Sequence, residues 1–334
     1  MKLLVTGGAG FIGSNFIHHI LSEHTDWEII NLDKLTYAGN LENLKDIEND
    51  ARYRFVKGDI GDRELVNTLL QERIDVIVNF AAESHVDRSI LDASPFIETN
   101  IKGTQTLLEG ARQYQTGKFI QVSTDEVYGS SEAGKFTEQS PLSPNSPYAA
   151  SKTAADLLCH ACWKTYQLPV IITRCSNNLG PFQFPEKLIP LVVTNALENK
   201  LIHIYGDGLN VRDWIYALDH CRALDLAIQK GKPGEVYNIA ASQEKTNLEL
   251  IHKLLDIMGK PRSLITFVTD RPGHDRRYAL DASKITMELG WKPAYSFEEA
   301  LTTTVNWYLD NEPWWRQIKS GEYARYYEGM YSHR

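Results

Sequence analysis

The chain has 334 residues, of which 43% are apolar and 23% charged, and its formal net charge is -8 at pH 7. This composition is typical of an ordinary globular protein and argues against a disordered or membrane-spanning one. Lysine and arginine are scattered, so no basic stripe indicates nucleic-acid binding. Because glycines follow the N-terminus too soon for a signal peptide, we expect a cytoplasmic protein. From the composition and the scattered basic residues we expect neither a membrane nor a nucleic-acid partner.

Apolar runs alternate with helix-like segments through the first half of the chain. Strands are predicted at 2–6, 28–33, 53–59, 75–82, 118–124 and 169–175. Helices are predicted within 10–24 and near 62–72, 95–115 and 148–166. Strands that are apolar throughout and alternate with helices indicate a parallel sheet covered on both faces. The predicted fold is therefore α/β, a doubly wound parallel sheet of the Rossmann type.

Beyond residue 175 the alternation gives way to segments punctuated by proline and glycine. Helices are predicted near 186–198, 246–258 and 297–310, and a strand at 234–240. We therefore expect a first domain at 1–175 and a smaller C-terminal α/β domain at 176–334 that binds substrate. The strand near 234–240 is expected to rejoin the first sheet.

Cysteines are few, and only Cys159 and Cys162 have the C-x-x-C spacing. They lack a second pair or a downstream histidine pair, so we predict no metal site and expect buried free thiols.

The segment TGGAGFIG places Gly7, Gly10 and Gly13 between the first predicted strand and the first predicted helix. Glycines here permit a tight turn, close approach of the backbone to a pyrophosphate and close packing of helix on sheet. Asp33 ends the second strand, where an acid can hydrogen-bond a ribose and repel a 2'-phosphate, which favours NAD over NADP. Asp59, at the end of the third strand, is predicted beside the adenine. Glycines that only turn and an aspartate that only caps are the alternatives.

The segment YAASK sets Tyr148 and Lys152 four residues apart, on one face if the segment is helical. A free tyrosine has a pKa of ~10, too high for a base at neutral pH. A neighbouring ammonium favours the phenolate, so we expect Lys152 to lower the pKa of Tyr148 and make it an acid–base group. Taken alone, the pair could equally be a solvated helix face.

Together with the glycine loop, this pair resembles the extended short-chain dehydrogenase/reductase family. The resemblance implies that Tyr148 takes the proton of a hydroxyl group while NAD receives the hydride of the same carbon. Lys152 supports Tyr148 in this scheme, and the hydroxyl of Thr124, which precedes the pair, binds the reacting oxygen.

Two adjacent carboxylates, Asp125 and Glu126, follow Thr124 and are not needed for hydride transfer alone. A ketone acidifies the neighbouring C–H, so a base and an acid could then eliminate water before the hydride returns. Consecutive residues of a regular strand point to opposite faces, so both carboxylates reach one substrate only if the strand ends near Thr124. Otherwise one of them caps or turns the chain.

Several longer segments resemble the nucleotide-sugar 4,6-dehydratases of the same family: STDEVYG, SPYAASK, TRCSNNLGPFQFPEKLIP, GDGLNVRDW and RPGHDRRYALD. The likeness spans residues 1 to about 310 and implies that Asp125 protonates the departing C6 hydroxyl and Glu126 is the base at C5. It also implies dTDP-glucose as substrate, a sugar-nucleotide-binding second domain, and a homodimer formed through the helices near 95–115 and 148–166. In one departure, Leu179 stands where the family usually has a tyrosine, so an aromatic contact near the nicotinamide is expected to be missing.

The resemblance also assigns binding residues. Beside NAD it places Gly7, Gly10, Phe11, Ile12, Gly13, Asp33, Lys34, Thr36, Asp59, Ile60, Ala81, Ala82, Thr99, Tyr148, Lys152 and Asn178. Beside the sugar nucleotide it places Ser84, Thr124, Asn177, Lys187, Leu188, Arg212, Asn247, Arg271 and His274. Two alternatives remain at this stage, a sugar-nucleotide 4-epimerase, which needs no acid–base pair, and a non-catalytic NAD-binding regulator.

Overall fold

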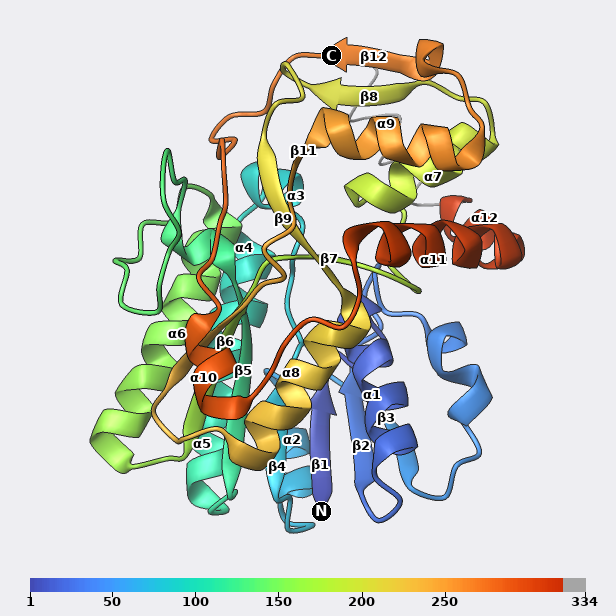
Figure 1. Ribbon diagram of the computed structural model, residues 1–334. Helices are drawn as coiled ribbons and strands as arrows, with labels where there is room; N and C mark the ends of the chain where they lie inside the picture. Colours follow the sequence, from blue (N-terminus) through green and yellow to red (C-terminus); the bar gives the residue numbers. More distant parts are fainter. Residues whose placement is uncertain (321–334) are drawn as a thin grey trace.

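The computed structural model describes residues 1–320. Its centre is a seven-stranded parallel sheet with the strand order β10-β6-β5-β4-β1-β2-β3 (Figure 1). This confirms the predicted doubly wound fold, including the return of a strand near 234–240 to the first sheet. The strands are β1 (Lys2–Thr6), β2 (Glu28–Asp33), β3 (Tyr53–Lys57), β4 (Val76–Asn79), β5 (Lys118–Thr124), β6 (Val170–Cys175) and β10 (Val236–Ile239).

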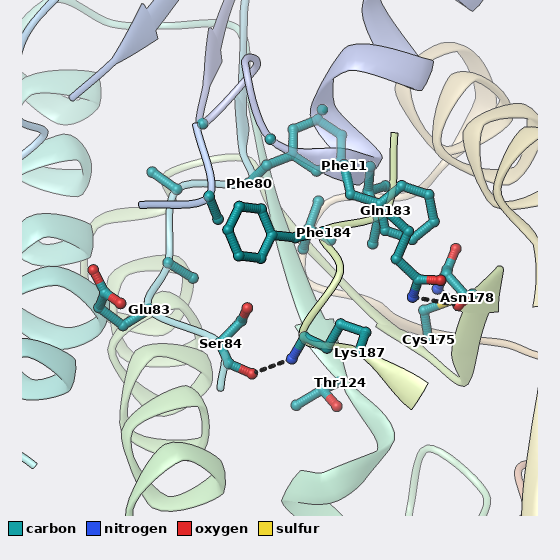
Figure 2. A pocket seen from close by; sticks show the side chains of 18 of the residues that line it. Phe11, Phe80, Glu83, Ser84, Thr124, Cys175, Asn178, Gln183, Phe184 and Lys187 are labelled. Carbon is teal, nitrogen blue, oxygen red and sulfur yellow. Dashed lines mark hydrogen bonds between the residues drawn. The ribbon is translucent and has the colours of Figure 1, made fainter. Parts of the chain in front are cut away.

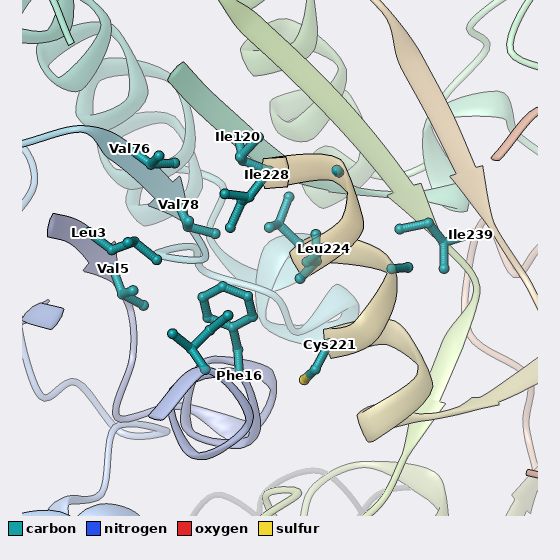
Figure 3. Close-up of a cluster of buried hydrophobic side chains, with 14 of the residues drawn as sticks. Leu3, Val5, Phe16, Val76, Val78, Ile120, Cys221, Leu224, Ile228 and Ile239 are labelled. Atoms are coloured by element: carbon teal, nitrogen blue, oxygen red, sulfur yellow. The ribbon is translucent and has the colours of Figure 1, made fainter. Parts of the chain in front are cut away.

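Helices cover both faces of this sheet because each presents one apolar stripe to it. On one face lie α1 (Phe11–Glu23), α8 (Ala217–Lys230) and α10 (Ser283–Leu289), and on the other α2 (Arg63–Leu70), α5 (Thr104–Gln113) and α6 (Pro147–Tyr166). Phe16 of α1 and Leu224 and Ile228 of α8 pack on Val5 and Val78 of the sheet (Figure 3). Complete burial of each such side chain stabilises the fold by about 1.5–3 kcal/mol.

A smaller second part lies at the carboxyl ends of the strands, in the upper half of Figure 1. Its apolar core is formed mainly by helices and short strands that follow residue 177. The strands are β7 (Asn177–Leu179), β9 (Val211–Tyr216) and β11 (Glu244–Thr246) in one sheet, and β8 (Ile202–Tyr205) and β12 (Ile265–Val268) in another. The helices are α7 (Leu188–Leu197), α9 (Asn247–Met258), α11 (Phe297–Asp310) and α12 (Glu312–Lys319).

The predicted helix over 95–115 is three pieces: α4 (Ser94–Phe96), a π-helical segment η2 (Ile97–Gly103) and α5. The wider turn accompanies buried Asn100, whose side chain bonds both backbone groups of Glu83 and the Ser151 hydroxyl. The periodicity of the local sequence does not reveal contacts with residues so distant in the chain. Helix α8 and the shorter elements η1 (Leu41–Ile47), α3 (Val86–Leu91) and η4 (Arg262–Leu264) were also not predicted.

No helix within residues 1–320 is both long and apolar enough to cross a membrane. The four cysteines are free thiols, and Cys159, Cys175 and Cys221 are buried, as expected for small apolar side chains.

Candidate active site

Two adjoining cavities of about 350 and 190 Å³ open where the parallel strands end, the usual ligand position of this architecture. The larger cavity follows the ends of β1, β2, β4, β5 and β6, and the smaller one extends into the second part. Figure 2 shows Phe11, Phe80, Phe184 and Lys187 among the residues of the larger cavity. Six residues line both cavities: Glu126, Asn177, Glu186, Lys187, Leu188 and Trp214.

The glycine loop fits closely between β1 and α1. Gly7 has a φ of +69°, and a Cβ there would lie 2.7 Å from the Ala81 nitrogen, while a Cβ on Gly13 would lie 2.4 Å from the Gly7 carbonyl oxygen. Gly10 caps α1 without a side-chain hydrogen bond, and no acid stands in the first turn. This end of α1 therefore presents free N–H groups and a positive dipole end, which suits the phosphates of a dinucleotide.

Asp33 is buried beside this loop and accepts hydrogen bonds from the backbone nitrogens of Ala9 (2.9 Å) and Leu35 (2.8 Å). Burial raises the pKa of its carboxyl group, and the two backbone bonds oppose that rise. The residue therefore turns the chain and also lines the larger cavity. Asp59 lines neither cavity, because its carboxylate faces Lys34 (2.7 Å) and the Gly61 nitrogen (2.8 Å).

Strand β5 ends at Thr124, and a 3-10 turn (η3, Asp125–Tyr128) begins there. The Thr124 hydroxyl caps this turn by accepting a hydrogen bond from the Glu126 nitrogen at 3.2 Å. Because the strand stops, Asp125 and Glu126 no longer alternate between sheet faces, and both line the larger cavity. The local condition for two carboxyl groups to act on one substrate is therefore met.

The two carboxyl groups have different surroundings. The pKa of Asp125 is raised to about 8, first by burial and then by the Glu126 charge, with Arg212 opposing. Burial also raises the pKa of Glu126, but Arg271, Lys187 and Arg212 oppose that rise and favour its carboxylate. At neutral pH Asp125 is therefore mainly a carboxylic acid, and the pair offers one acid and one potential base.

Helix α6 brings Tyr148 and Lys152 to the same cavity. Ser146 caps the helix by accepting from the Ala149 nitrogen (3.1 Å), and Pro147 occupies its first turn, so Tyr148 stands at the cavity end. Lys152 is buried and donates from Nζ to the Val122 carbonyl oxygen over 2.7 Å.

The expected direction of the Tyr148 pKa is wrong. Burial raises the pKa of the phenol well above its ordinary value, and the Glu126 charge raises it further, while a hydrogen bond with Thr124 acts in the opposite direction. Burial also lowers the pKa of Lys152. The sequence spacing indicated a cation near Tyr148, but it could not show the burial that raises the pKa of the phenol.

Cationic side chains gather in the smaller cavity. Lys187 donates from Nζ to the Ser84 carbonyl oxygen (2.9 Å), as Figure 2 shows. Buried Arg212 donates to the Asp275 carbonyl oxygen (2.9 Å) and lies over the Tyr278 ring, 4.3 Å from its centroid. Burial lowers the pKa of both Lys187 and Arg212, which marks positive charge held away from water. Such a cluster suits an anionic ligand.

All residues predicted for the site line one of the two cavities, except Asp59. Arg212, Asn247, Arg271 and His274 line only the smaller cavity. Their individual binding roles stay predictions. Leu179 lines neither cavity and is fully buried in the core of the second part. Prediction missed several lining residues: Gln183, Phe184, Glu186, His203, Tyr205, Trp214, His220 and Tyr278.

The fold and this site define an extended short-chain dehydrogenase/reductase, with a glycine loop after β1, a Tyr-Lys pair on α6 and a hydroxyl at the end of β5. The sequence model of the family described as GDP-mannose 4,6 dehydratase matches residues 4–304. The chain belongs to this family.

Similar proteins include a dTDP-glucose 4,6-dehydratase of Xanthomonas campestris pv. campestris (strain B100), which is 52% identical over 340 residues and covers 96% of each chain. The solved structure of DesIV, a dTDP-glucose 4,6-dehydratase from Streptomyces venezuelae with NAD bound, is 53% identical with a TM-score of 0.94, covering 96% of this chain and 100% of that one. A UDP-glucuronic acid 4-epimerase from Bacillus cereus is more distant, at 31% identity and a TM-score of 0.88, covering 93% and 99%.

Proposed function

We propose that this protein converts dTDP-glucose to dTDP-4-keto-6-deoxyglucose, a step of deoxysugar biosynthesis, by oxidation at C4, elimination of water across C5 and C6, and reduction at C6. The adjacent carboxyl groups of Asp125 and Glu126 in one cavity carry this proposal. A 4-epimerase or a simple dehydrogenase has no use for an acid and a base one carbon apart. Full-length similarity to enzymes named for this reaction supports it.

NAD is the cofactor of this reaction, and the larger cavity fits it. Gly7 and Gly13 leave no room for a Cβ where the backbone must approach the pyrophosphate, and α1 presents uncapped N–H groups beside them. NAD supplies the chemistry of accepting a hydride from C4 and returning it to C6, so no net oxidant is consumed. Asp33, within the same cavity, would accept a hydrogen bond from the adenosine ribose.

Oxidation at C4 requires a proton acceptor for the C4 hydroxyl. Tyr148 takes this proton, and Thr124, which is hydrogen-bonded to Tyr148, also binds the C4 oxygen. Because burial and Glu126 raise the pKa of Tyr148, its basicity depends on positive charge nearby. Lys152 supplies that charge from the next turn of α6.

Elimination then uses the carboxyl pair. Glu126 removes the C5 proton that the C4 ketone has acidified; burial raises its pKa, and Arg271, Lys187 and Arg212 oppose that rise. Asp125, protonated at neutral pH, gives its proton to the C6 hydroxyl, which leaves as water. Once C6 is reduced, Glu126 gives its proton back to C5. The proton that Tyr148 took from the C4 hydroxyl replaces, through solvent, the one that Asp125 gave to the leaving water, so atoms and charges balance.

The smaller cavity would hold the sugar nucleotide. Lys187, Arg212 and Arg271 offer the charge-assisted hydrogen bonds that a diphosphate requires in a cleft. Asn177, Leu188, Asn247 and His274 complete the proposed contacts, and Ser84 approaches the hexose. This supports the prediction that 176–334 is mainly a sugar-nucleotide-binding domain, although 321–334 lie outside the described residues.

Mass spectrometry tests the proposal directly. The purified protein is incubated with dTDP-glucose without reductant, with UDP-glucose in parallel. We expect the dTDP sugar to lose one water and the UDP sugar to react more slowly, because one methyl group distinguishes the bases and is worth only about 1–3 kcal/mol. An unchanged mass with inverted hexose stereochemistry would instead identify a 4-epimerase, and no change at all would favour a non-catalytic regulator.

We further propose a cytoplasmic homodimer. Large apolar side chains are exposed on α6 and on the segments before α5, including Leu157 (56% exposed), Leu91 (72%) and Ile97 (46%). Packing against a second copy would remove them from water. Free cysteines are typical of a reducing compartment. Light scattering of the purified protein tests the dimer, and Leu157→Glu should shift it toward monomer, whereas exposed Met287→Glu on α10 should not.

A further inference from the structure

One corner of the larger cavity contains three buried polar side chains from different segments. Ser176 follows β6, Gln183 precedes α7 and His220 belongs to α8, and their exposures are 4%, 8% and 0%. Ser176 Oγ, Gln183 Oε1 and His220 Nε2 have no hydrogen-bond partner within residues 1–320. Buried polar atoms without partners are costly, so three at one cavity corner indicate a polar ligand group.

Asn178 connects the three residues. Its Nδ2 donates to the Ser176 carbonyl oxygen (3.0 Å), and its Oδ1 lies 3.0 Å from His220 Nδ1. Its own carbonyl oxygen accepts from Gln183 Nε2 at 3.0 Å (Figure 2). The three residues that carry the unpaired atoms therefore belong to one connected network.

The network determines which atoms donate and which accept. Carbonyl oxygens can only accept, so the nitrogens of the Asn178 and Gln183 amides must face them, which leaves Gln183 Oε1 as a free acceptor. Asn178 Oδ1 likewise requires a proton on His220 Nδ1. Burial lowers the pKa of His220 to about 3, so the ring is neutral and Nε2 is an acceptor.

The corner thus offers two acceptors, Gln183 Oε1 and His220 Nε2, and one hydroxyl donor, Ser176 Oγ. We propose that it binds the carboxamide of the nicotinamide ring, whose two N–H groups match the acceptors and whose carbonyl oxygen matches the hydroxyl. This inference rests on the proposed NAD cofactor and assigns three positioning residues for it. Holding the amide here would set the rotation of the ring in the cavity that also contains Tyr148 and Thr124.

Cofactor analogues test this on the unaltered protein. The full-length, NAD-loaded chain is titrated with NAD, with 3-acetylpyridine adenine dinucleotide, in which a methyl group replaces the amide nitrogen, or with ADP-ribose, and displaced nucleotide is measured by chromatography. We expect the acetylpyridine analogue to compete at least about 10-fold less well than NAD, because two buried acceptors lose their donors. Equal competition by the two dinucleotides would overturn the inference.

Variants separate the three contacts. His220→Phe should reduce the preference for NAD over the acetylpyridine analogue. Ser176→Ala should weaken both dinucleotides about equally, by about 5-fold, because both keep the carbonyl oxygen. Neither change should alter competition by ADP-ribose, which lacks the ring. His19→Phe, at a buried histidine that does not line this cavity, is the matched control and should leave all ratios unchanged.

The outcomes distinguish this inference from the proposed cofactor. If ADP-ribose affinity falls together with dinucleotide affinity in both variants, the corner supports the fold and does not recognise the carboxamide. If His220→Phe fails to fold, the analogue series on the unaltered chain and the Ser176→Ala variant still decide whether the corner recognises the carboxamide. If the unaltered protein binds neither NAD nor ADP-ribose, the cofactor assignment itself is wrong.

Discussion

Asp125→Asn should stabilise the protein while removing its activity. The substitution replaces a buried acid, 3% exposed, with a neutral amide of the same shape that can still accept from the Thr124 hydroxyl. The folded pKa of about 8 exceeds the ordinary value of 3.8, so folding requires Asp125 to keep a proton that the unfolded chain releases. The stability of the unaltered protein therefore falls as pH rises from 3.8 toward about 8, and asparagine abolishes this loss.

The size of the effect follows from the interval between the ordinary pKa and the working pH. Each pH unit is worth about 1.36 kcal/mol, so retaining the proton at pH 7 costs up to about 4 kcal/mol. Relaxation of the turn around Asp125 would reduce this figure. We expect the free energy of unfolding of Asp125→Asn, relative to that of the unaltered protein, to be about 2–4 kcal/mol greater at pH 7 than near pH 4.

Guanidinium unfolding of both proteins between about pH 5 and pH 7.5 measures the difference, with m-values compared to confirm similar transitions. Asp62→Asn is the control, because exposed Asp62 caps α2 and asparagine caps equally well. The difference in unfolding free energy between Asp62→Asn and the unaltered protein should not depend on pH. Water loss from dTDP-glucose should fall by about 10²–10⁴-fold in Asp125→Asn, because the acid is missing. A stability difference that stays constant with pH would refute a protonated Asp125.

Three further predictions concern the other parts of the site. Glu126→Gln should permit oxidation at C4 but slow water loss by about 10²–10⁴-fold, so NADH absorbance should persist on the enzyme; unchanged water loss would remove Glu126 from its role. Lys152→Met should slow single-turnover NADH formation at neutral pH and recover as pH rises, because burial already raises the pKa of Tyr148; an equal loss at every pH would assign Lys152 to binding alone. Gly13→Ala places a Cβ 2.4 Å from the Gly7 carbonyl oxygen, so the purified variant should carry less NAD, and full occupancy would contradict the tight cradle.

Much of the sheet was predictable because its strands are short, apolar and separated by glycine or helix signals. Helix α8 was missed although Cys221, Leu224 and Ile228 recur at helical spacing on its buried face. Proline- and glycine-rich segments on either side of it obscured that pattern. The π-helical turn at Ile97–Gly103 had no local signal, because Asn100 serves a contact with Glu83.

The catalytic set was predictable for a related reason. Tyr148 and Lys152 share one helix, and Thr124, Asp125 and Glu126 are consecutive, so spacing indicated them as candidates. The family resemblance then supplied their roles. Gln183, Trp214 and His220 could not be found in this way, because they come from separate segments and meet only in the folded chain. The error in the expected direction of the Tyr148 pKa has the same origin, since the burial that raises this pKa comes from the folded chain and not from local spacing.

Local spacing in the chain thus predicted a Rossmann-type sheet, a dinucleotide loop and candidate reacting groups, because each depends on residues a few positions apart. The family resemblance assigned the roles of those groups. Folding determines the protonation of Asp125 and Glu126, because it depends on burial and on cations brought in from the second part of the molecule. It also decided where the acceptors of the proposed carboxamide site lie, because hydrogen bonds through Asn178 join segments that no local pattern connects.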